Sequence, residues 1–350
     1  MGLVQVDGAI ELNQFFPVGR SHADTTNVRV RVDPTSFRYV EVFGGAPINL
    51  PWMTTARVRG EGTHAVLSHV KGRGARPPGD YLRVRLESVD APELHFRPTN
   101  PLPKPTDAQR EAFKRFNEEY RQWCAEMAVF RLVHHLDDLA TNGAVSCLVE
   151  TEVDAPNEIF DAYGRFVGVI QLHSVAGPQP LNDWLLDRGL ALPAFYSSAR
   201  IAAIDRLTAI AADASQKDRG VWDAYRNQIE AFDPELRFRK LTGFTRTDAA
   251  KDRQRFTTPK LFRRQAAWEA TRLANLPVAK TLPEFLATGT GNEYVTLDDF
   301  RLQGLEAAPT HFLGDLIRST GRLRLRPDQI IFKEKPSTLV DPRGQLITHS

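Results

Sequence analysis

Hydrophobic and polar residues alternate along several short stretches in the first half of the chain. Residues 27–32 read NVRVRV, and residues 81–89 read YLRVRLESV, so one side of each stretch is apolar and the other polar. Residues 8–16, 145–153 and 165–172 follow the same period less strictly. We therefore expect five main strands, of which the first two form an antiparallel hairpin.

Helical spacing appears between these stretches and after them. Thr106 and Asp107 follow a Pro-rich linker and can cap a long helix that extends to residue 130. Its apolar residues recur every three or four positions (Phe113, Phe116, Tyr120, Cys124, Met127 and Phe130). Residues 181–190, which Gly189 ends, and residues 199–217 indicate two further helices. Strands mainly precede helices, an order typical of an α+β fold.

Two regions depart from this series. Residues 33–80 are rich in Gly and Pro, include a candidate strand at 65–70, and are best interpreted as an insertion in a hairpin. From residue 228 the composition changes, with short helical patterns at 282–287, 297–302 and 311–319 and a predicted hairpin at 330–347. We expect a first domain over residues 1–227 and a smaller, mostly helical C-terminal domain over 228–350.

The composition excludes several classes of protein. Hydrophobic residues make up 42% of the chain and charged residues 25%, which excludes collagen, a disordered tail and a membrane protein. The net charge of +2 over 350 residues restricts any nucleic-acid site to a local patch. Two cysteines are too few for a disulfide framework or a cysteine-ligated zinc. Without an export-signal pattern or a long apolar run, we expect a cytoplasmic protein with no membrane partner.

One basic stretch could be such a patch. Residues 237–272 contain eleven Lys and Arg but only three acidic residues, and aromatic side chains are interleaved among them. Charge neutralisation and base stacking would make this stretch a platform for single strands. The competing interpretation, which we favour, is an amphipathic helix at residues 261–274 with a solvated basic face and buried aromatics.

Charged residues that suit phosphate chemistry occur in two separated motifs. Residues 84–93 read VRLESVDAPE, where Asp90 and Glu93 flank a proline turn, so their side chains can converge on a cation. Residues 161–165 read DAYGR. Arg85 and Arg165 are planar donors suited to phosphate oxygens. Arg85 taken alone would more readily be interpreted as half of a structural ion pair, but the ordered set favours a catalytic site.

This order of motifs resembles the staphylococcal nuclease (thermonuclease) family. The resemblance rests on VRLESVDAPE, YGR, LNDWLLDRGLA and a helix that ends near GVWDAY, and it spans about residues 10–225. It implies a five-stranded OB-fold barrel with three helices and calcium-dependent hydrolysis of DNA, RNA or both, with little sequence preference. Nucleic acid would be the substrate, and the C-terminal domain is a candidate surface for a regulatory partner.

The resemblance also implies roles for individual residues. Arg85, Glu93 and Arg165 would be catalytic, and Asp90 would bind Ca²⁺ together with the backbone carbonyl of Ala91, where the family more commonly has threonine. Carboxylates crowded into one pocket require a compensating cation. Glu93 would activate water, and the two arginines would stabilise the charge on the phosphorus oxygens.

The resemblance implies a second metal-binding aspartate between the first two strands. Two positions compete for this role. Residues 60–63, GEGT, are similar to the turn that the family has here, but they place Gly or Glu at the ligand position. Asp24 and Thr25 instead lie shortly before NVRVRV. We prefer Asp24, because it also gives the barrel its first hairpin. Asp and Thr before a strand are, however, also ordinary turn residues.

Three aromatic residues are candidates for substrate binding. Tyr163 matches the tyrosine of the family's YGR loop, although Ala162 replaces the usual lysine. Phe195 and Tyr196 fall near the family's nucleotide-stacking tyrosines.

The alternative to an enzyme is a non-catalytic OB-fold module that binds nucleic acid or protein, but such members typically lose the carboxylates and arginines that this chain retains. We expect one of the adjacent His134 and His135 to be packed and the other solvated.

Overall fold

The chain divides into two compact units. The first, called here the barrel unit, comprises Met1–Glu87, Val129–Trp184 and Lys335–Ser350, and the second unit comprises Ser88–Ala128 and Leu185–Glu334. A computed structural model describes residues 2–16, 18, 25–41, 44–49, 57–59, 67–69, 80–102, 104–117, 120–153, 159–161, 165–228, 256–278, 281–288, 291–318, 323–333 and 338–340. The domain boundary expected between residues 227 and 228 concerns independent folding, and it stays a prediction.

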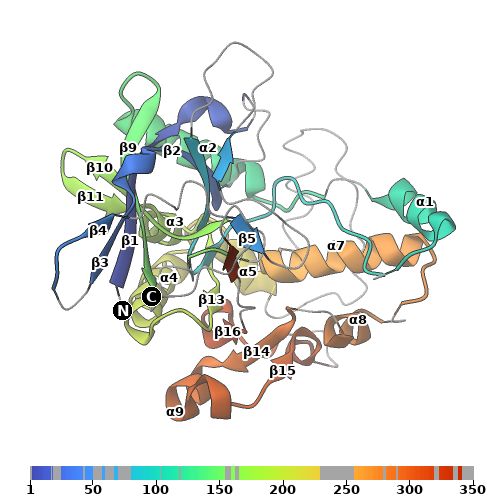
Figure 1. The fold of residues 1–350 in the computed structure, drawn as a ribbon. Coiled ribbons are helices and arrows are strands. Elements are labelled where there is room, and N and C mark those ends of the chain that lie inside the picture. The colour runs from blue at the N-terminus through green and yellow to red at the C-terminus, as the bar shows by residue number, and fades with distance from the viewer. Residues whose placement is uncertain are drawn as a thin grey trace. The chain divides into compact units, whose positions relative to one another are not determined.

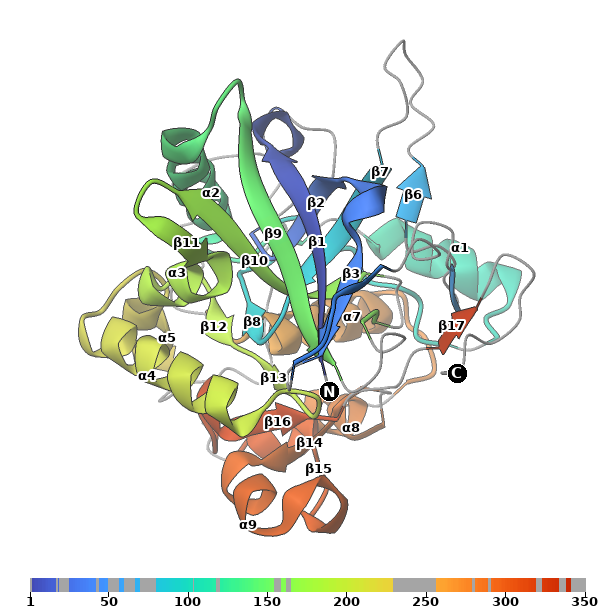
Figure 2. The same cartoon turned by 60° about the vertical axis from the view of Figure 1, so that its left-hand side comes forward.

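Five strands close into a barrel, as the sequence predicted (Figures 1 and 2). They are β1 (Gly2–Glu11), β2 (Asn27–Val32), β7 (Asp80–Leu86), β9 (Ala144–Val153) and β10 (Phe166–Ser174). The ring runs β1, β2, β7, β10, β9 and back to β1. Only the β7–β10 pairing is parallel. This closed five-stranded barrel with helices is the expected OB fold.

Alternation of side chains explains why these strands close. Val28 and Val30 of β2 and Val84 of β7 are fully buried, whereas the arginines between them are partly exposed. Each strand thus places an apolar row in the barrel core. The first two strands pair antiparallel, with Ile10 opposite Val30, so the predicted first hairpin is confirmed.

The region expected to be an insertion contributes strands of its own. The described pieces are β3 (Arg38–Glu41), β4 (Ile48–Asn49), β5 (Arg57–Arg59) and β6 (Leu67–His69). Strand β3 pairs with the first half of β1, and β6 pairs with β7, so both extend the barrel sheet. The barrel unit also contains β11 (Gly177–Pro180), β17 (Thr338–Val340) and the 3-10 turns Leu12–Gln14 and Pro34–Ser36.

Helices make up most of the regular secondary structure described in the second unit. Its helices are α1 (Asp107–Phe116), α4 (Ile201–Gln216), α5 (Trp222–Gln228), α7 (Pro259–Leu273), α8 (Leu282–Thr288) and α9 (Leu297–Ala307). Helices α2 (Ala125–Leu139) and α3 (Leu181–Asp187) each begin in one unit and end in the other. A small sheet in the order β13 (Phe195–Tyr196), β16 (Ile330–Phe332), β14 (Glu293–Thr296) and β15 (His311–Phe312) accompanies the helices, and β8 (Val89–Asp90) pairs with β12 (Leu192–Pro193).

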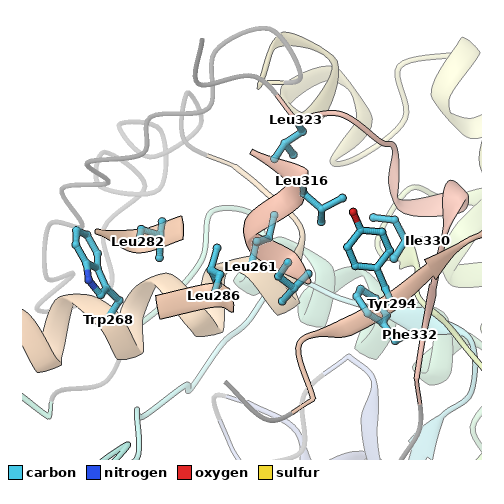
Figure 3. Packing of buried hydrophobic residues seen from close by; sticks show 10 residues of the cluster. Leu261, Trp268, Leu282, Leu286, Tyr294, Leu316, Leu323, Ile330 and Phe332 are labelled. Carbon is cyan, nitrogen blue, oxygen red and sulfur yellow. The ribbon is translucent and has the colours of Figure 1, made fainter. Parts of the chain in front are cut away.

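Two hydrophobic clusters hold the C-terminal part of the second unit together. In the first, side chains from α7, α8, β14 and β16 face one another, as Figure 3 shows for Leu261, Leu286, Tyr294 and Phe332. The second surrounds Phe256, whose ring lies 5.8 Å from that of Trp123 and 6.4 Å from that of Tyr225. The residues that follow position 255 are therefore part of the core of this unit.

The long helix expected from residue 107 to residue 130 is wrong. The structure has α1, then non-helical residues at 120–124, then α2. Tyr120 and Phe96 exchange backbone hydrogen bonds of 2.7 and 3.1 Å, and Cys124 takes a positive φ of 67°. Strand-like pairing with the segment after Glu93 outweighs the helical spacing of the apolar residues here, which illustrates how tertiary contacts override local preference.

The helix expected at residues 311–319 is also wrong. Residues 311–316 form β15 and the 3-10 turn Leu313–Leu316. In the first arm of the expected hairpin, β16 lies between β13 and β14 while β17 pairs with β5. The turn of this hairpin, expected at residues 341–344, and its second arm lie outside the described residues, so the hairpin stays a prediction. The 3-10 turn Pro327–Gln329 leads into β16.

Two glycines let separate motifs approach closely. Gly189 follows α3 with φ 61°, and Gly220 precedes α5 with φ 56°. A Cβ at Gly189 would lie 2.1 Å from the carbonyl oxygen of Arg219, and one at Gly220 would lie 2.0 Å from that of Gly189. Val221 N donates a 2.8 Å hydrogen bond to Gly189 O. The helix end predicted at Gly189 is confirmed, and the backbones of the segments LNDWLLDRGLA and GVWDAY are in direct contact.

Gly189→Ala is expected to destabilise the protein by about 2–4 kcal/mol, because the new methyl group would meet backbone in a left-handed conformation. Gly143→Ala is the matched control, since Gly143 has φ 76° and no atom near its hypothetical Cβ. That control should lose only about 1 kcal/mol. Urea unfolding of both variants measures the difference, and equal losses would contradict the close approach.

Candidate functional site

The two arginines of the predicted catalytic set lie on one face of the barrel sheet. Strand β7 pairs in parallel with β10, with Arg85 opposite Val167 and Val84 opposite Phe166. Val84 and Phe166 point into the core, so Arg85 is on the outer face. Arg165, two residues before Val167, follows the same alternation. The strand order thus brings together residues 80 positions apart in the chain.

Asp161 fixes the orientation of Arg165. Its Oδ2 accepts hydrogen bonds from Arg165 Nε at 2.8 Å and lies 2.7 Å from Nη2, while Oδ1 accepts from the backbone N of Arg165 at 3.0 Å. The Asp161 side chain is 7% exposed and that of Arg165 25%. A carboxylate that grips both the backbone and the guanidinium restricts the rotamers of Arg165.

Arg83 is a third guanidinium on this face. It stands two residues before Arg85 on β7 and opposite Arg29 on β2. Burial, then the positive charge of Arg165, lower the pKa of Arg83, and Asp161 opposes that decrease. Like charges directly opposite each other are unfavourable in a sheet, so this concentration of positive charge is suited to an anion.

The predicted acidic residues lie in a tightly held turn of the second unit. Ser88, with φ 60°, starts the turn, and its carbonyl accepts from Ala194 N at 3.0 Å. Asp90 pairs with Leu192 through β8 and β12. Ala91 and Leu94 are buried, whereas the Glu93 side chain between them remains 14% exposed.

Gln122 holds the backbone of this turn from the other side. Glu93 N donates to Gln122 Oε1 at 3.2 Å, and Gln122 N donates to Glu93 O at 2.8 Å. The buried Gln122 side chain also donates to Thr257 O at 2.5 Å. The loop that carries Glu93 is therefore joined to the residues that immediately precede α7.

Arg263 of α7 is paired with both predicted acidic residues. Its Nη2 lies 2.9 Å from Asp90 Oδ2, and its Nη1 lies 3.3 Å from Asp90 Oδ1 and also contacts Glu93 Oε1. The side chains of Asp90 and Glu93 are 16% and 14% exposed. Burial opposes the charge of Arg263, but the two carboxylates outweigh it and hold the pKa of Arg263 well above its usual value.

The basic residues in the first half of α7 are consequently not solvated, contrary to the interpretation that we favoured, whereas Arg272 near its end is 55% exposed. Lys260 lies 3.7 Å from the centre of the Phe332 ring, and Arg264 donates to Asn292 at 2.7 Å. The helix and the burial of Phe262 and Trp268 are confirmed. Those two buried rings cannot form the stacking platform, and the part of the basic stretch before residue 256 lies outside the described residues.

The chemistry of the donor set suits a hard cation. Asp90 and Glu93 already converge on one positive charge, and carboxylate oxygens are the ligands that calcium prefers. Thr25, which follows the predicted ligand Asp24, has a buried hydroxyl oxygen without a hydrogen-bond partner among the described residues, a feature that calls for a bound ion or water. Those residues contain no group of three or more His, Cys, Asp and Glu placed to hold a metal.

The remaining predicted site residues are placed as follows. Asp24, the competing residues 60–63 and Tyr163 lie outside the described residues. Phe195 is fully buried, which argues against a stacking role, whereas Tyr196 is partly exposed beside Phe332, with ring centres 5.6 Å apart. His135 stacks on Trp184 at 4.1 Å and His134 is 80% exposed, so the expected division between the two histidines is confirmed.

Three residues that bear on the site escaped sequence reasoning. Alternation in YLRVRLESV could have identified Arg83, because it shares a face with Arg85. Asn182, in the motif LNDW, is buried and donates to the carbonyl of Glu87 at 2.8 Å, which fixes the end of β7. Arg263 gave no usable signal, since 170 residues separate it from Glu93.

No described helix is long and apolar enough to cross a membrane.

No curated protein matches the chain. A family model described as staphylococcal nuclease homologue matches residues 83–224, an interval that begins at Arg83 and ends in α5. That interval contains Arg85, Asp90, Glu93 and Arg165 in the predicted order. Together with the closed five-stranded barrel, this match identifies residues 83–224 as a region of the staphylococcal nuclease homologue family.

Proposed function

We propose that this chain is a calcium-dependent nuclease that hydrolyses phosphodiester bonds in DNA, RNA or both, with little sequence preference. The match of residues 83–224 to a nuclease homologue family supports a hydrolase acting on nucleic acid. The observation that carries the proposal is the strand register, which groups Arg83, Arg85 and Arg165 on one sheet face. Such a face suits a backbone of phosphates more than a single neutral ligand.

Each catalytic group has a role that follows from its chemistry. Glu93 accepts the proton of a water molecule, which attacks phosphorus in line with the departing oxygen. Arg85 and Arg165 donate hydrogen bonds to the non-bridging oxygens, where negative charge accumulates as the new bond forms. Asp161 keeps the Arg165 guanidinium in one orientation, so little reorganisation is needed during reaction.

Asp24, Asp90 and the carbonyl of Ala91 would hold the calcium ion. When bound, a divalent cation of this kind neutralises phosphate charge and orients the phosphate. Tyr163 and Tyr196 would contact the nucleotide beside the reacting phosphate. The protein would act inside the cell, with nucleic acid as its substrate and the C-terminal region as the surface for regulation.

Plasmid DNA and single-stranded RNA, incubated with the full chain in calcium, magnesium or chelator, test the proposal directly. We expect cleavage of at least one substrate in millimolar calcium, weaker cleavage in magnesium, and none in chelator. Intact substrates in all three conditions, with a folded protein by circular dichroism, would refute catalysis. Equal cleavage with chelator would refute the metal requirement.

A non-catalytic OB-fold module that binds nucleic acid is the second candidate. The pairing of Arg263 with Asp90 and Glu93 favours it, because both carboxylates are already neutralised. Such a module would bind oligonucleotides without cutting them, and its affinity would not change in Glu93→Gln. A nuclease would lose cleavage in that variant and keep binding.

A further inference from the structure

We propose that Arg263 is a built-in competitor for the divalent cation, so that α7 keeps the carboxylate pair in a latent state. This inference rests on the proposed function, since it concerns access to the same Asp90 and Glu93. It assigns a regulatory role to a residue that lies 39 positions beyond the family match, which ends at residue 224.

The contact geometry is that of a cation seated between its ligands. One nitrogen, Nη1, reaches both Asp90 Oδ1 and Glu93 Oε1, while Nη2 holds the other Asp90 oxygen. Both Asp90 oxygens and one Glu93 oxygen are therefore engaged by a single guanidinium. A metal ion that used these carboxylates would have to displace that guanidinium, because two positive charges cannot share one pair of carboxylates at low cost.

Helix α7, which carries Arg263, is held in place by a side-chain cap and by hydrophobic packing. Thr258 caps α7, with its Oγ1 accepting from Leu261 N at 3.4 Å, and Phe262 packs with Tyr120 and Phe96. Gln122 joins the residue before that cap to the backbone of Glu93. The guanidinium and its partners are thus positioned by one network, which lowers the entropic cost of the ion pair.

Charge balance strengthens the case for a specific contact. Arg263 is only 29% exposed and its carboxylate partners less so, which places this ion pair in a poorly solvated region. Removing one side of such a pair leaves charge of one sign uncompensated. The carboxylates of Asp90 and Glu93 therefore require a positive charge beside them, and either Arg263 or a divalent ion can supply it.

The test compares calcium binding by the full-length wild type, Arg263→Gln and Arg272→Gln. Arg272 is the matched control, because it is on the same helix, carries the same charge and, among the described residues, has its ion pair with Glu269 and not with the turn. We expect Arg263→Gln to bind calcium between about 5-fold and 150-fold more tightly than wild type, the usual range for coupled sites. Isothermal titration and the rise of Tm with calcium provide readouts that do not depend on cleavage.

Each result decides between the alternatives. Unchanged or weaker calcium affinity in folded Arg263→Gln would overturn the competitor role, even if the wild type proves to be a nuclease. Tighter binding without any cleavage would support the role and refute the nuclease. If Arg263→Gln folds only when calcium is present, the competitor role is supported. If Arg263→Gln does not fold at all, Arg263→Lys replaces the forked guanidinium with a single ammonium group. This variant should bind calcium more tightly than wild type, and unchanged binding would overturn the inference.

Discussion

Glu93→Gln should reduce the rate of phosphodiester cleavage by about 10²–10⁴-fold, because the amide cannot accept a proton from water. The side chain keeps its size and can still receive a hydrogen bond from Arg263, so the turn should remain folded. Single-turnover cleavage of a labelled oligonucleotide in saturating calcium measures the chemical step.

Glu111→Gln provides the comparison for Glu93→Gln. Glu111 lies on α1 within 3.8 Å of Lys114, and its side chain is 68% exposed. That variant should cleave at the wild-type rate. A loss below about tenfold in Glu93→Gln, with an unchanged circular dichroism spectrum, would show that another group takes the proton.

Arg165→Lys should lower kcat by about 10²–10³-fold with a smaller change in KM. Lysine keeps the charge but lacks the planar fork that can serve Asp161 and a phosphate together. A transition-state role predicts this separation of kcat from KM, whereas a role in binding alone would raise KM. Steady-state cleavage of a defined oligonucleotide provides both constants.

Arg31→Lys is the matched substitution for Arg165→Lys in the barrel unit. Arg31 lies on β2, is half exposed and pairs with Glu11 at 3.1 Å. Its conversion to lysine should leave both constants unchanged. If Arg165→Lys behaved like Arg31→Lys, the position would serve only the ion pair with Asp161.

The barrel could be predicted because its strands carry their own signal. Alternation in NVRVRV and YLRVRLESV fixes which side of each strand is buried, and β2 begins and ends where the pattern does. In the structure, the same alternation puts the side chain of Arg85 on the face opposite the buried Val84. The parallel pairing of β7 with β10 could not be predicted from alternation, because it joins chain segments that are about 80 residues apart.

The non-helical conformation of residues 120–124 could not be predicted, because it depends on a partner that is distant in the sequence. Apolar residues at helical spacing, including Tyr120 and Cys124, also fit the buried side of an irregular segment. Hydrogen bonds between Phe96 and Tyr120 decide between these conformations, and they form only in the folded chain. A local pattern contains no information about such a bond.

The pairing of Arg263 was missed for a related reason. Within the basic stretch, its charge predicted a solvated helical face, which is the usual place for such residues. Its guanidinium is instead placed against Asp90 and Glu93, because Phe262 and Ala266 of the same helix pack beside Tyr120. Burial of the neighbouring apolar residues therefore determines which acidic groups the arginine meets.

Phe256 has a consequence for whether the residues before it could fold without the C-terminal part of the chain. Its ring fills the space beside Trp123 and Tyr225, although it lies beyond the last residue of the family match. A chain that stopped after α5 would leave a void there and expose two large aromatic rings to water. The residues up to the end of α5 would therefore need different side chains at this place to close their core without Phe256.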